Sequence, residues 1–442
     1  MFRKTIAAFV IFFLVFSLTA CGGKSPVTAS LTTITTSITI SSTSTTAVNN
    51  TVLIPDRNLE KAIREALGKP EGTISKADMA TIVSIVAERQ EIENLGGLEY
   101  CVNMESLAVP FNNISDISPL SALTKIKELD LTSNKVNDLT VLSGLVNLHI
   151  LHLTYNQISD LSPLAPLVGL EYLYVDINKI EDILIMKQLT GLKELDLTSN
   201  KVSNLTALSG LRNLQILRLA DNQISDIYPL TPLVSLECLD LGANKIDDIS
   251  PVKQLTGLKE LSIGSNPITD ISVLLSLKTL KKLDLSSIRT HDFTLLSELK
   301  SLNVLDMSGN YDIDISPLSS LTDLNELQLN QCQVTDISPL QSLHNLVKLE
   351  LVANSITDVS ALGQLTNLQS LNLYGNRIEN ISALASLTQM KVLDLANNRI
   401  SDITPLASLS NLRSLRIFQS NPLNTESRIL IQQLTANFVI VQ

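Results

Sequence analysis

Histidine and cysteine are the residue types best suited to chemistry in this chain, and both are scarce. The sequence has four histidines and four cysteines. Only His152 has a carboxylate and a phenol at nearby repeat positions, Asp130 and Tyr174. Hydrolysis by a Ser-His-Asp arrangement also needs a nucleophile beside the imidazole, and the sequence places none there. We therefore expect no enzyme activity, no catalytic residue, no cofactor and no metal.

Exposed aromatic and arginine side chains offer a second kind of chemistry, which is noncovalent recognition. The first group comprises His152, Tyr155, Tyr172 and Tyr174, with Phe111 and Arg218 two repeats to either side. A second, smaller group comprises Tyr374, Arg416 and Phe418. Aromatic and arginine residues dominate the binding energy of protein interfaces. We expect both groups to contact a ligand; the alternative is that a few exposed aromatics on so long a surface are incidental.

An asparagine that recurs every 22 residues positions these groups. The recurring asparagines are Asn112, Asn134, Asn156, Asn178, Asn200, Asn222, Asn244, Asn266, Asn310, Asn354, Asn376 and Asn398. At two of the 22-residue steps another residue, Ile288 or Cys332, replaces the asparagine. The same spacing extends back to Gln90 and forward to Ser420. The shared pattern, L-x-x-L-x-L-x-x-N-x-I-x-D-I-x-P-L, resembles the leucine-rich repeat. The expected fold class is an α/β repeat solenoid, a leucine-rich-repeat horseshoe of about sixteen 22-residue coils.

Each coil has a strand, a turn and a helical segment. In Leu129-Asp130-Leu131 the alternation directs both leucines inward and Asp130 outward, so stacked coils make a parallel sheet on the concave face. The asparagine amide satisfies backbone groups at the bend. Ser118 is expected to cap a short helical turn on the convex side, with Pro119 in its first turn. An aspartate recurs once per coil at this turn, so we interpret it as scaffold and not as a metal ligand.

Both ends of a repeat array need covers, because their apolar layers and sheet edges are otherwise exposed. Residues 52–82 are expected to form a helical N-terminal cap, with one helix after Asp56 and a second after Ser75. The repeats span 83–420, and residues 421–442 form a C-terminal cap of one helix and one strand.

The first residues have the pattern of an export signal. Residues 1–20 combine a short basic start with about thirteen apolar residues, too few to span a bilayer. The sequence Leu18-Thr19-Ala20-Cys21 resembles a bacterial lipobox, which implies lipidation of Cys21; an ordinary secretory signal is the alternative. Residues 21–51, rich in Ser and Thr, predict a flexible tether. We expect an exported protein that is lipid-anchored to the bacterial cell envelope, at the outer membrane or the cell membrane.

The composition limits the partners. Net charge is −11 and the chain has 9 Phe, 7 Tyr and no Trp. An acidic chain is repelled by nucleic acid and by anionic lipid surfaces, so we expect no nucleic-acid partner and membrane contact only through the N-terminal lipid. The likeness of residues 129–194 to residues 195–260, which are identical at 45 of 66 positions, indicates duplication of a three-coil block.

The coils and the segment IPDRNLEKAIREALGKPEG resemble internalin-type bacterial surface proteins, in a lipoprotein-anchored variant. The resemblance covers residues 52–442 and implies the fold and a surface location. No immunoglobulin-like module follows the repeats, so we do not extend a host-invasion role to this chain. The resulting hypothesis is a monomeric, envelope-anchored protein whose concave face binds a protein or a surface glycan. The alternative is a passive structural or adhesive lipoprotein with no discrete ligand.

Overall fold

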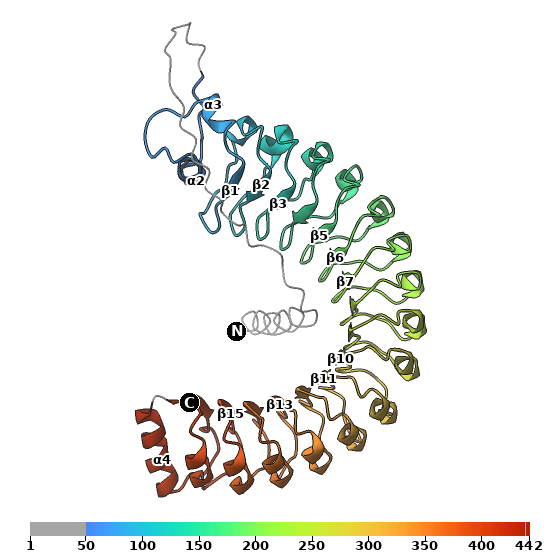
Figure 1. Ribbon diagram of the computed structural model, residues 1–442, viewed down its shortest axis with the longest axis vertical. Coiled ribbons are helices and arrows are strands. Elements are labelled where there is room, and N and C mark those ends of the chain that lie inside the picture. The colour runs from blue at the N-terminus through green and yellow to red at the C-terminus, as the bar shows by residue number, and fades with distance from the viewer. Residues whose placement is uncertain (1–49, 438) are drawn as a thin grey trace, which may run out of the picture. The chain divides into compact units, whose positions relative to one another are not determined.

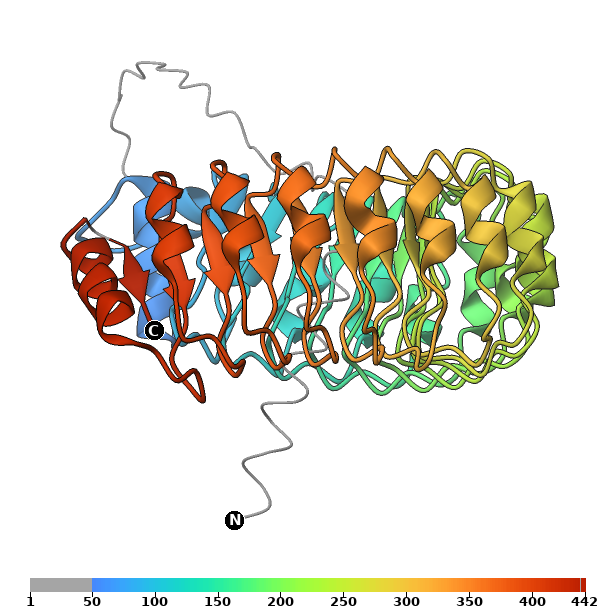
Figure 2. The same cartoon turned by 90° about the horizontal axis from the view of Figure 1, so that it is seen from below.

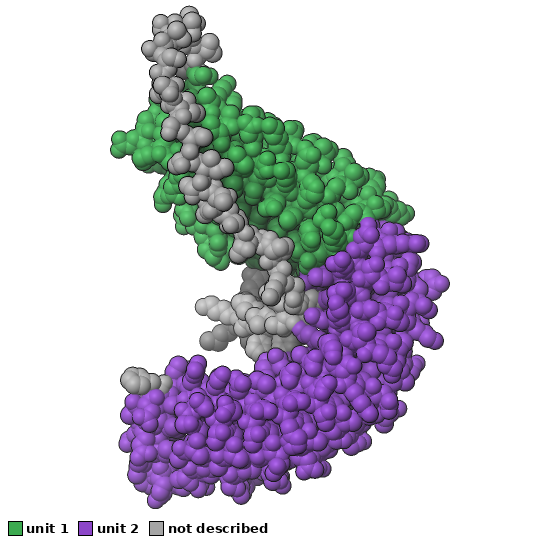
Figure 3. Space-filling view, viewed as in Figure 1, with its two compact units in different colours: residues 1–202 green, residues 203–442 purple. Residues whose placement is uncertain are grey.

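The computed structural model describes residues 50–437 and 439–442 of the chain. The predicted export signal, Cys21 and nearly all of the predicted tether lie outside these residues. The chain forms two compact units, residues 1–202 (unit 1) and residues 203–442 (unit 2) (Figure 3). Each unit is a stack of coils with strands on one side and short 3-10 helices on the other (Figure 1).

Unit 1 begins with a two-helix cap. Helix α2 (Arg57–Leu67) starts at Asp56, whose side chain accepts from the backbone N–H groups of Asn58 and Leu59, and its buried residues include Leu59 and Ile63. Helix α3 (Lys76–Met79) starts at Ser75 in a reciprocal capping box with Asp78. Both helix starts confirm the sequence prediction.

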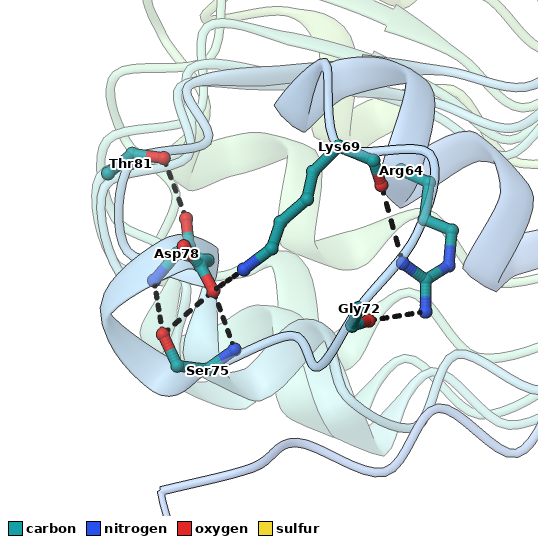
Figure 4. A network of polar contacts seen from close by, with 6 residues as sticks. All are labelled: Arg64, Lys69, Gly72, Ser75, Asp78 and Thr81. Atoms are coloured by element: carbon teal, nitrogen blue, oxygen red, sulfur yellow. Dashed lines mark hydrogen bonds and ion pairs between the residues drawn. The ribbon is translucent and has the colours of Figure 1, made fainter.

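The Asp78 carboxylate ties this cap together (Figure 4). It accepts from the Ser75 N–H at 2.8 Å and from the Lys69 ammonium at 2.9 Å. These hydrogen bonds lower the pKa of Asp78 to about 2. The Arg64 guanidinium closes the intervening loop by donating to the carbonyl oxygens of Lys69 and Gly72. These contacts hold α2, α3 and the loop between them together, while the Asp56 carboxylate accepts from the N–H groups of Glu93 and Asn94 in the first coil.

The strands of unit 1 pair in parallel, each with the next, from β1 to β6. They are β1 (Ser84–Val86), β2 (Ser106–Ala108), β3 (Glu128–Asp130), β4 (Ile150–His152), β5 (Tyr172–Tyr174) and β6 (Glu194–Asp196). Partners are always 22 residues apart, as in the pair Leu129–Leu151. The central residue of every strand is a buried Leu or Ile, and the two flanking residues face the strand side, which we call the concave face.

Unit 2 continues the same coil. Its strands are β7 (Ile216–Arg218), β8 (Cys238–Asp240), β9 (Glu260–Ser262), β10 (Lys282–Asp284), β11 (Val304–Asp306), β12 (Glu326–Gln328), β13 (Lys348–Glu350), β14 (Ser370–Asn372), β15 (Val392–Asp394), β16 (Ser414–Arg416) and β17 (Ile440–Val441). Helix α4 (Thr425–Ala436), capped by Asn424, covers the last coil (Figure 2). The leucine-rich-repeat fold, the parallel sheet and both caps are confirmed.

The recurring asparagine, buried or partly buried, links each coil to the one before it through hydrogen bonds. The Asn134 side-chain amide donates to the carbonyl oxygens of Val109, Leu131 and Thr132, and its oxygen accepts from the Ile114 N–H. One side chain therefore satisfies backbone groups of two successive coils, which is why the residue recurs. At the Cys332 step the thiol donates only to the Met307 and Asn330 carbonyl oxygens.

The Ile288 step leaves a gap in this ladder. Ile288 has no polar side-chain atom for the Ile268 N–H, the group equivalent to the Ile114 N–H above. Ile268 is buried, and its N–H makes no hydrogen bond within the described chain. An unpaired buried N–H destabilises a fold by about 1–3 kcal/mol, so this coil is weakened.

The prediction that Ser118 caps the convex turn is wrong. The 3-10 helix η2 (Ser118–Ala122) starts at Ser118 itself, and the Asp116 carboxylate accepts the Ser118 N–H at 2.8 Å. The same contact recurs from Asp138 to Thr140 and from Asp160 to Ser162. A short acidic side chain reaches the N–H two residues ahead, so the recurring aspartate satisfies the first N–H of the 3-10 helix from just before it, and its interpretation as scaffold is supported.

Candidate functional site

The concave face of unit 1 changes character from strand to strand. The outward positions of β3 are Glu128 and Asp130, and those of β6 are Glu194 and Asp196. Between them, β4 and β5 present a contiguous block, Ile150, His152, Tyr172 and Tyr174, in which Ile150 pairs with Tyr172 and His152 with Tyr174. We call these four residues the aromatic block. It is two strands wide and has a carboxylate strand on each side.

His152 and Tyr174 form a stacked pair at the centre of the block. Their ring centroids are 4.4 Å apart and their planes differ by 8°. Strands in a sheet are about 4.8 Å apart, so side chains in register at this spacing can stack with little distortion. Both residues are partly exposed, and the pair offers flat ring surface on a backbone fixed by hydrogen bonds.

The electrostatics of His152 favour the neutral ring. Burial lowers the pKa of His152, and Asp130, Glu194 and Glu128 oppose that shift through their negative charge. Burial prevails because removing an imidazolium from water disfavours the charged form more than these carboxylates favour it. The three carboxylates lie near enough to act on the ring, from both flanking strands.

Tyr172 occupies the other edge of the block. The Lys193 ammonium lies 6.0 Å from its ring centroid, near the limit of a cation–π contact. Lys193 also pairs with Glu171 at 2.7 Å, and the hydrogen bond to Glu171 raises the pKa of Lys193. Tyr172 thus contacts a cation that is already neutralised by a neighbouring carboxylate.

Tyr155 and Phe111 lie beside the strands and not on them. Both occupy the position before the recurring asparagine, where the backbone is left-handed: φ is 55° at Tyr155 and 56° at Phe111. Tyr155 is 58% exposed, whereas the guanidinium of Arg89 lies 4.2 Å from the Phe111 ring centroid. Tyr155 extends the aromatic block at its rim, while Phe111 is engaged within the first coils.

The remaining predicted residues belong to unit 2. Arg218 is the last residue of β7. Tyr374 and Phe418 occupy the same repeat position in coils that are two steps apart. Ala396, which occupies this position in the coil between them, is buried. Arg416 pairs with Asp394 at 2.9 Å. Tyr374 and Phe418 show no ring contact with each other in the described part of the chain, so the second group is looser than the first.

Sequence reasoning missed Glu128, Ile150 and Glu194. They occupy the first outward position of each strand, two residues before the column that contains Asp130 and His152. The signal was in the sequence, because a strand has two outward positions on either side of its central leucine. Reading both columns would have shown the alternation of charged and aromatic strands.

The concave face of unit 2 carries acidic and basic side chains, and several of its outward residues are buried. Asp240 is 2% exposed and Asp306 is 5% exposed, and Ser262 donates to Asp284 at 2.9 Å. Burial and the adjacent Asp284 raise the pKa of Asp306 to about 7. Among the described residues, no group of three or more histidine, cysteine or acidic side chains is arranged to hold a metal ion.

Comparison with family models assigns the repeats. The model described as "Leucine Rich repeats (2 copies)" matches residues 146–185, 190–233, 212–254, 234–276, 344–386 and 388–430, and the model "Leucine Rich repeat" matches 122–139. This chain is a leucine-rich-repeat protein. No curated protein matches its sequence.

Solved structures resemble this leucine-rich-repeat chain over most of its length. A leucine-rich-repeat protein of Leptospira interrogans is 27% identical, with a TM-score of 0.71, over 83% of this chain and 97% of that one. An internalin of Listeria monocytogenes, InlF, is 29% identical, with a TM-score of 0.51, over 84% and 91%. The functional domain of InlJ from the same bacterium is 24% identical, with a TM-score of 0.65, over 82% and 80%, which shows a shared fold. The predicted likeness to internalins is confirmed.

None of the described helices combines the length and apolar character that crossing a membrane requires.

Proposed function

We propose that this protein is an exported binding protein that holds a protein ligand on the concave face of unit 1. The observation that carries the proposal is the stacked, partly exposed His152–Tyr174 pair, with Tyr172 and Tyr155 beside it. Rings of this kind are frequent anchors at interfaces, because they bury a large area and have few rotatable bonds.

The scaffold strengthens the case for binding. The block lies on two neighbouring strands whose backbones hydrogen-bond in register, and the Asn156 and Asn178 side chains bracket the turns that follow. A surface that is already ordered loses little conformational entropy on association. Fixed aromatic side chains on such a surface favour recognition of a shaped partner.

The proposed location rests on the N-terminal sequence. We propose that residues 1–20 are removed on export, that Cys21 is acylated, and that residues 21–51 tether the repeats to the envelope. The acyl chains would contribute about 0.8 kcal/mol per buried methylene, and two or more chains anchor stably. Cys21→Ser should move the protein from the membrane fraction to the soluble fraction; unchanged partitioning would remove the anchor from the proposal.

Affinity capture from envelope extracts tests the binding site. The wild-type mature protein should retain a partner that the Tyr172→Ala/Tyr174→Ala variant loses, by at least about tenfold, which corresponds to about 1.4 kcal/mol. The matched control is Glu326→Ala/Gln328→Ala, which alters the equivalent two positions of β12 in unit 2. Protease treatment of the extract should abolish capture of a protein ligand and spare that of a glycan.

Equal capture by wild type and the tyrosine variant would contradict the proposed site. Failure to capture any partner, together with unchanged behaviour of cells that lack the inner coils, would favour a passive structural lipoprotein instead.

A further inference from the structure

The charges around the aromatic block indicate which kind of partner it accepts. The outward positions of β3 and β6 are all carboxylates, and neither β4 nor β5 carries a lysine or arginine. The carboxylates of Glu128, Asp130 and Glu194 act on the His152 ring from both sides. A ligand group centred on the rings therefore meets the negative charge of Glu128 and Asp130 on the β3 side.

The rings themselves do not offset that charge. Burial lowers the pKa of His152 and so favours its neutral form, and a tyrosine ring carries no positive charge. The Lys193 ammonium nearby is already paired with Glu171. Neutral aromatic faces bordered by carboxylates attract a cation over the ring and repel an anion.

We propose that the aromatic block binds an arginine side chain from a basic segment of the partner protein, an inference that rests on the proposed function. The guanidinium is planar, stacks on aromatic rings, and donates in a fork that fits a carboxylate. A lysine ammonium would satisfy the charge without the stacking, and an acidic protein or an anionic glycan would be repelled.

The flanking carboxylates are placed to share this role. Glu128 is exposed and Asp130 partly exposed. One oxygen of Asp130 accepts from the Thr132 N–H at 2.8 Å, which fixes the carboxylate beside the ring pair. A guanidinium on the rings can therefore hydrogen-bond to an acceptor that is already oriented.

The test uses a fluorescein-labelled peptide, Gly-Ser-Arg-Gly-Arg-Ser-Gly, and a twin in which neutral citrulline replaces both arginines. Fluorescence anisotropy with the full mature chain should show the arginine peptide binding at least about tenfold more tightly than its twin. Glu128→Gln/Asp130→Asn, which keeps side-chain shape and the Asp130 acceptor, should weaken arginine-peptide binding by about tenfold or more. Tyr174→Ala should weaken it similarly.

The matched control for charge is Glu326→Gln/Glu350→Gln, which removes two carboxylates from the concave face of unit 2 and should leave binding unchanged. Equal binding of the two peptides, or an equal loss in the control, would overturn the inference. If capture of the native partner still depends on Tyr172 and Tyr174 but not on Glu128 and Asp130, the proposed function stands and the arginine assignment falls. If capture depends on neither pair, the proposed function falls as well.

Discussion

Units 1 and 2 are built from the same coil, yet their concave faces differ in chemistry. In unit 1 three of the four outward residues of β4 and β5 are partly exposed rings, whereas in unit 2 the outward residues of β8, β9 and β11 include buried polar and acidic groups. Burial favours the neutral form at His152 in unit 1 and at Asp306 in unit 2. For a base this lowers the pKa and for an acid it raises it.

The duplicated block shows how this difference arises. Tyr172 and Tyr174 of the first copy correspond to Cys238 and Asp240 of the second, while the central leucine of the strand (Leu173 and Leu239) and the recurring asparagine (Asn178 and Asn244) are the same in both copies. The inward columns are fixed by packing with the next coil. The outward columns are not, so they can change without loss of the fold.

The largest expected effect concerns Asp306. Its pKa is about 7 in the folded protein, well above the value near 4 of an unfolded chain. The folded state therefore binds this proton more tightly, so the contribution of Asp306 to the free energy of unfolding is greatest below about pH 4 and is lost as the pH rises through 7. Wild type should lose roughly 3 kcal/mol between about pH 5 and pH 8, and Asp306→Asn should abolish that loss. Hydrogen exchange of a peptide containing Val304–Asp306 measures this loss of stability. The same dependence on pH in wild type and in Asp306→Asn would contradict the raised pKa of Asp306.

A smaller effect is expected at the gap in the asparagine ladder of unit 2. Ile288→Asn should supply an acceptor for the Ile268 N–H and stabilise this coil by about 1 kcal/mol, because the gained hydrogen bond outweighs the lost apolar contacts. Ile288→Ala, which loses the contacts without the acceptor, should destabilise the coil. Urea unfolding of the three proteins gives the order, and a less stable Ile288→Asn protein would show that the N–H is satisfied in another way.

A comparable gain is expected in unit 1 at Ile177, where φ is 54°. A β-branched side chain in the left-handed region is strained by about 1 kcal/mol or more, and asparagine tolerates it. Ile177→Asn should raise the melting temperature by a few degrees. The control, Ser199→Asn, starts from an unbranched residue at φ 53° and should raise the melting temperature less. An equal rise in both variants would show that branching at the β-carbon is not the cause.

The smallest expected effect concerns His152, whose contribution to stability changes with pH in the opposite direction to that of Asp306. Because the pKa of His152 is lowered by burial, the unfolded chain binds the proton more tightly. Stability is then complete above about pH 6.5 and is lost as pH falls through the lower folded-state pKa. Unit 1 should weaken toward acid in the range where unit 2 strengthens. Hydrogen exchange of a peptide containing Ile150–His152 should show this slope in wild type and not in His152→Gln.

Most of the fold follows from the sequence, because the 22-residue period determines which residues stack. It predicts the inward leucines, the asparagine brackets and both caps. It did not predict that Asp116 accepts the Ser118 N–H at the convex turn, since that depends on where the 3-10 helix starts. For the site, the period places His152 beside Tyr174, but ring stacking depends on side-chain rotamers.

The depth of the outward residues was also beyond the sequence. Asp130 and Asp240 occupy the same column, yet Asp130 is partly exposed and Asp240 is 2% exposed. The exposure of an outward side chain depends on the size and orientation of its neighbours on adjacent strands. The repeat period gives the position of a residue within its coil, but it does not give the solvent exposure of its side chain.

The left-handed residue before each asparagine has a consequence for how such proteins diversify. Phe, Ser, Tyr, Ile, Asp, Ala and Gln all occupy that position at nearly the same φ. Ser287 and Gln331 keep this φ although Ile288 and Cys332 follow them, so the backbone of the coil does not depend on the side chain at this position. A protein that grows by duplication of coils therefore keeps the same backbone, and the side chains at this position can be substituted one at a time. New binding preferences can then evolve without an intervening unfolded ancestor.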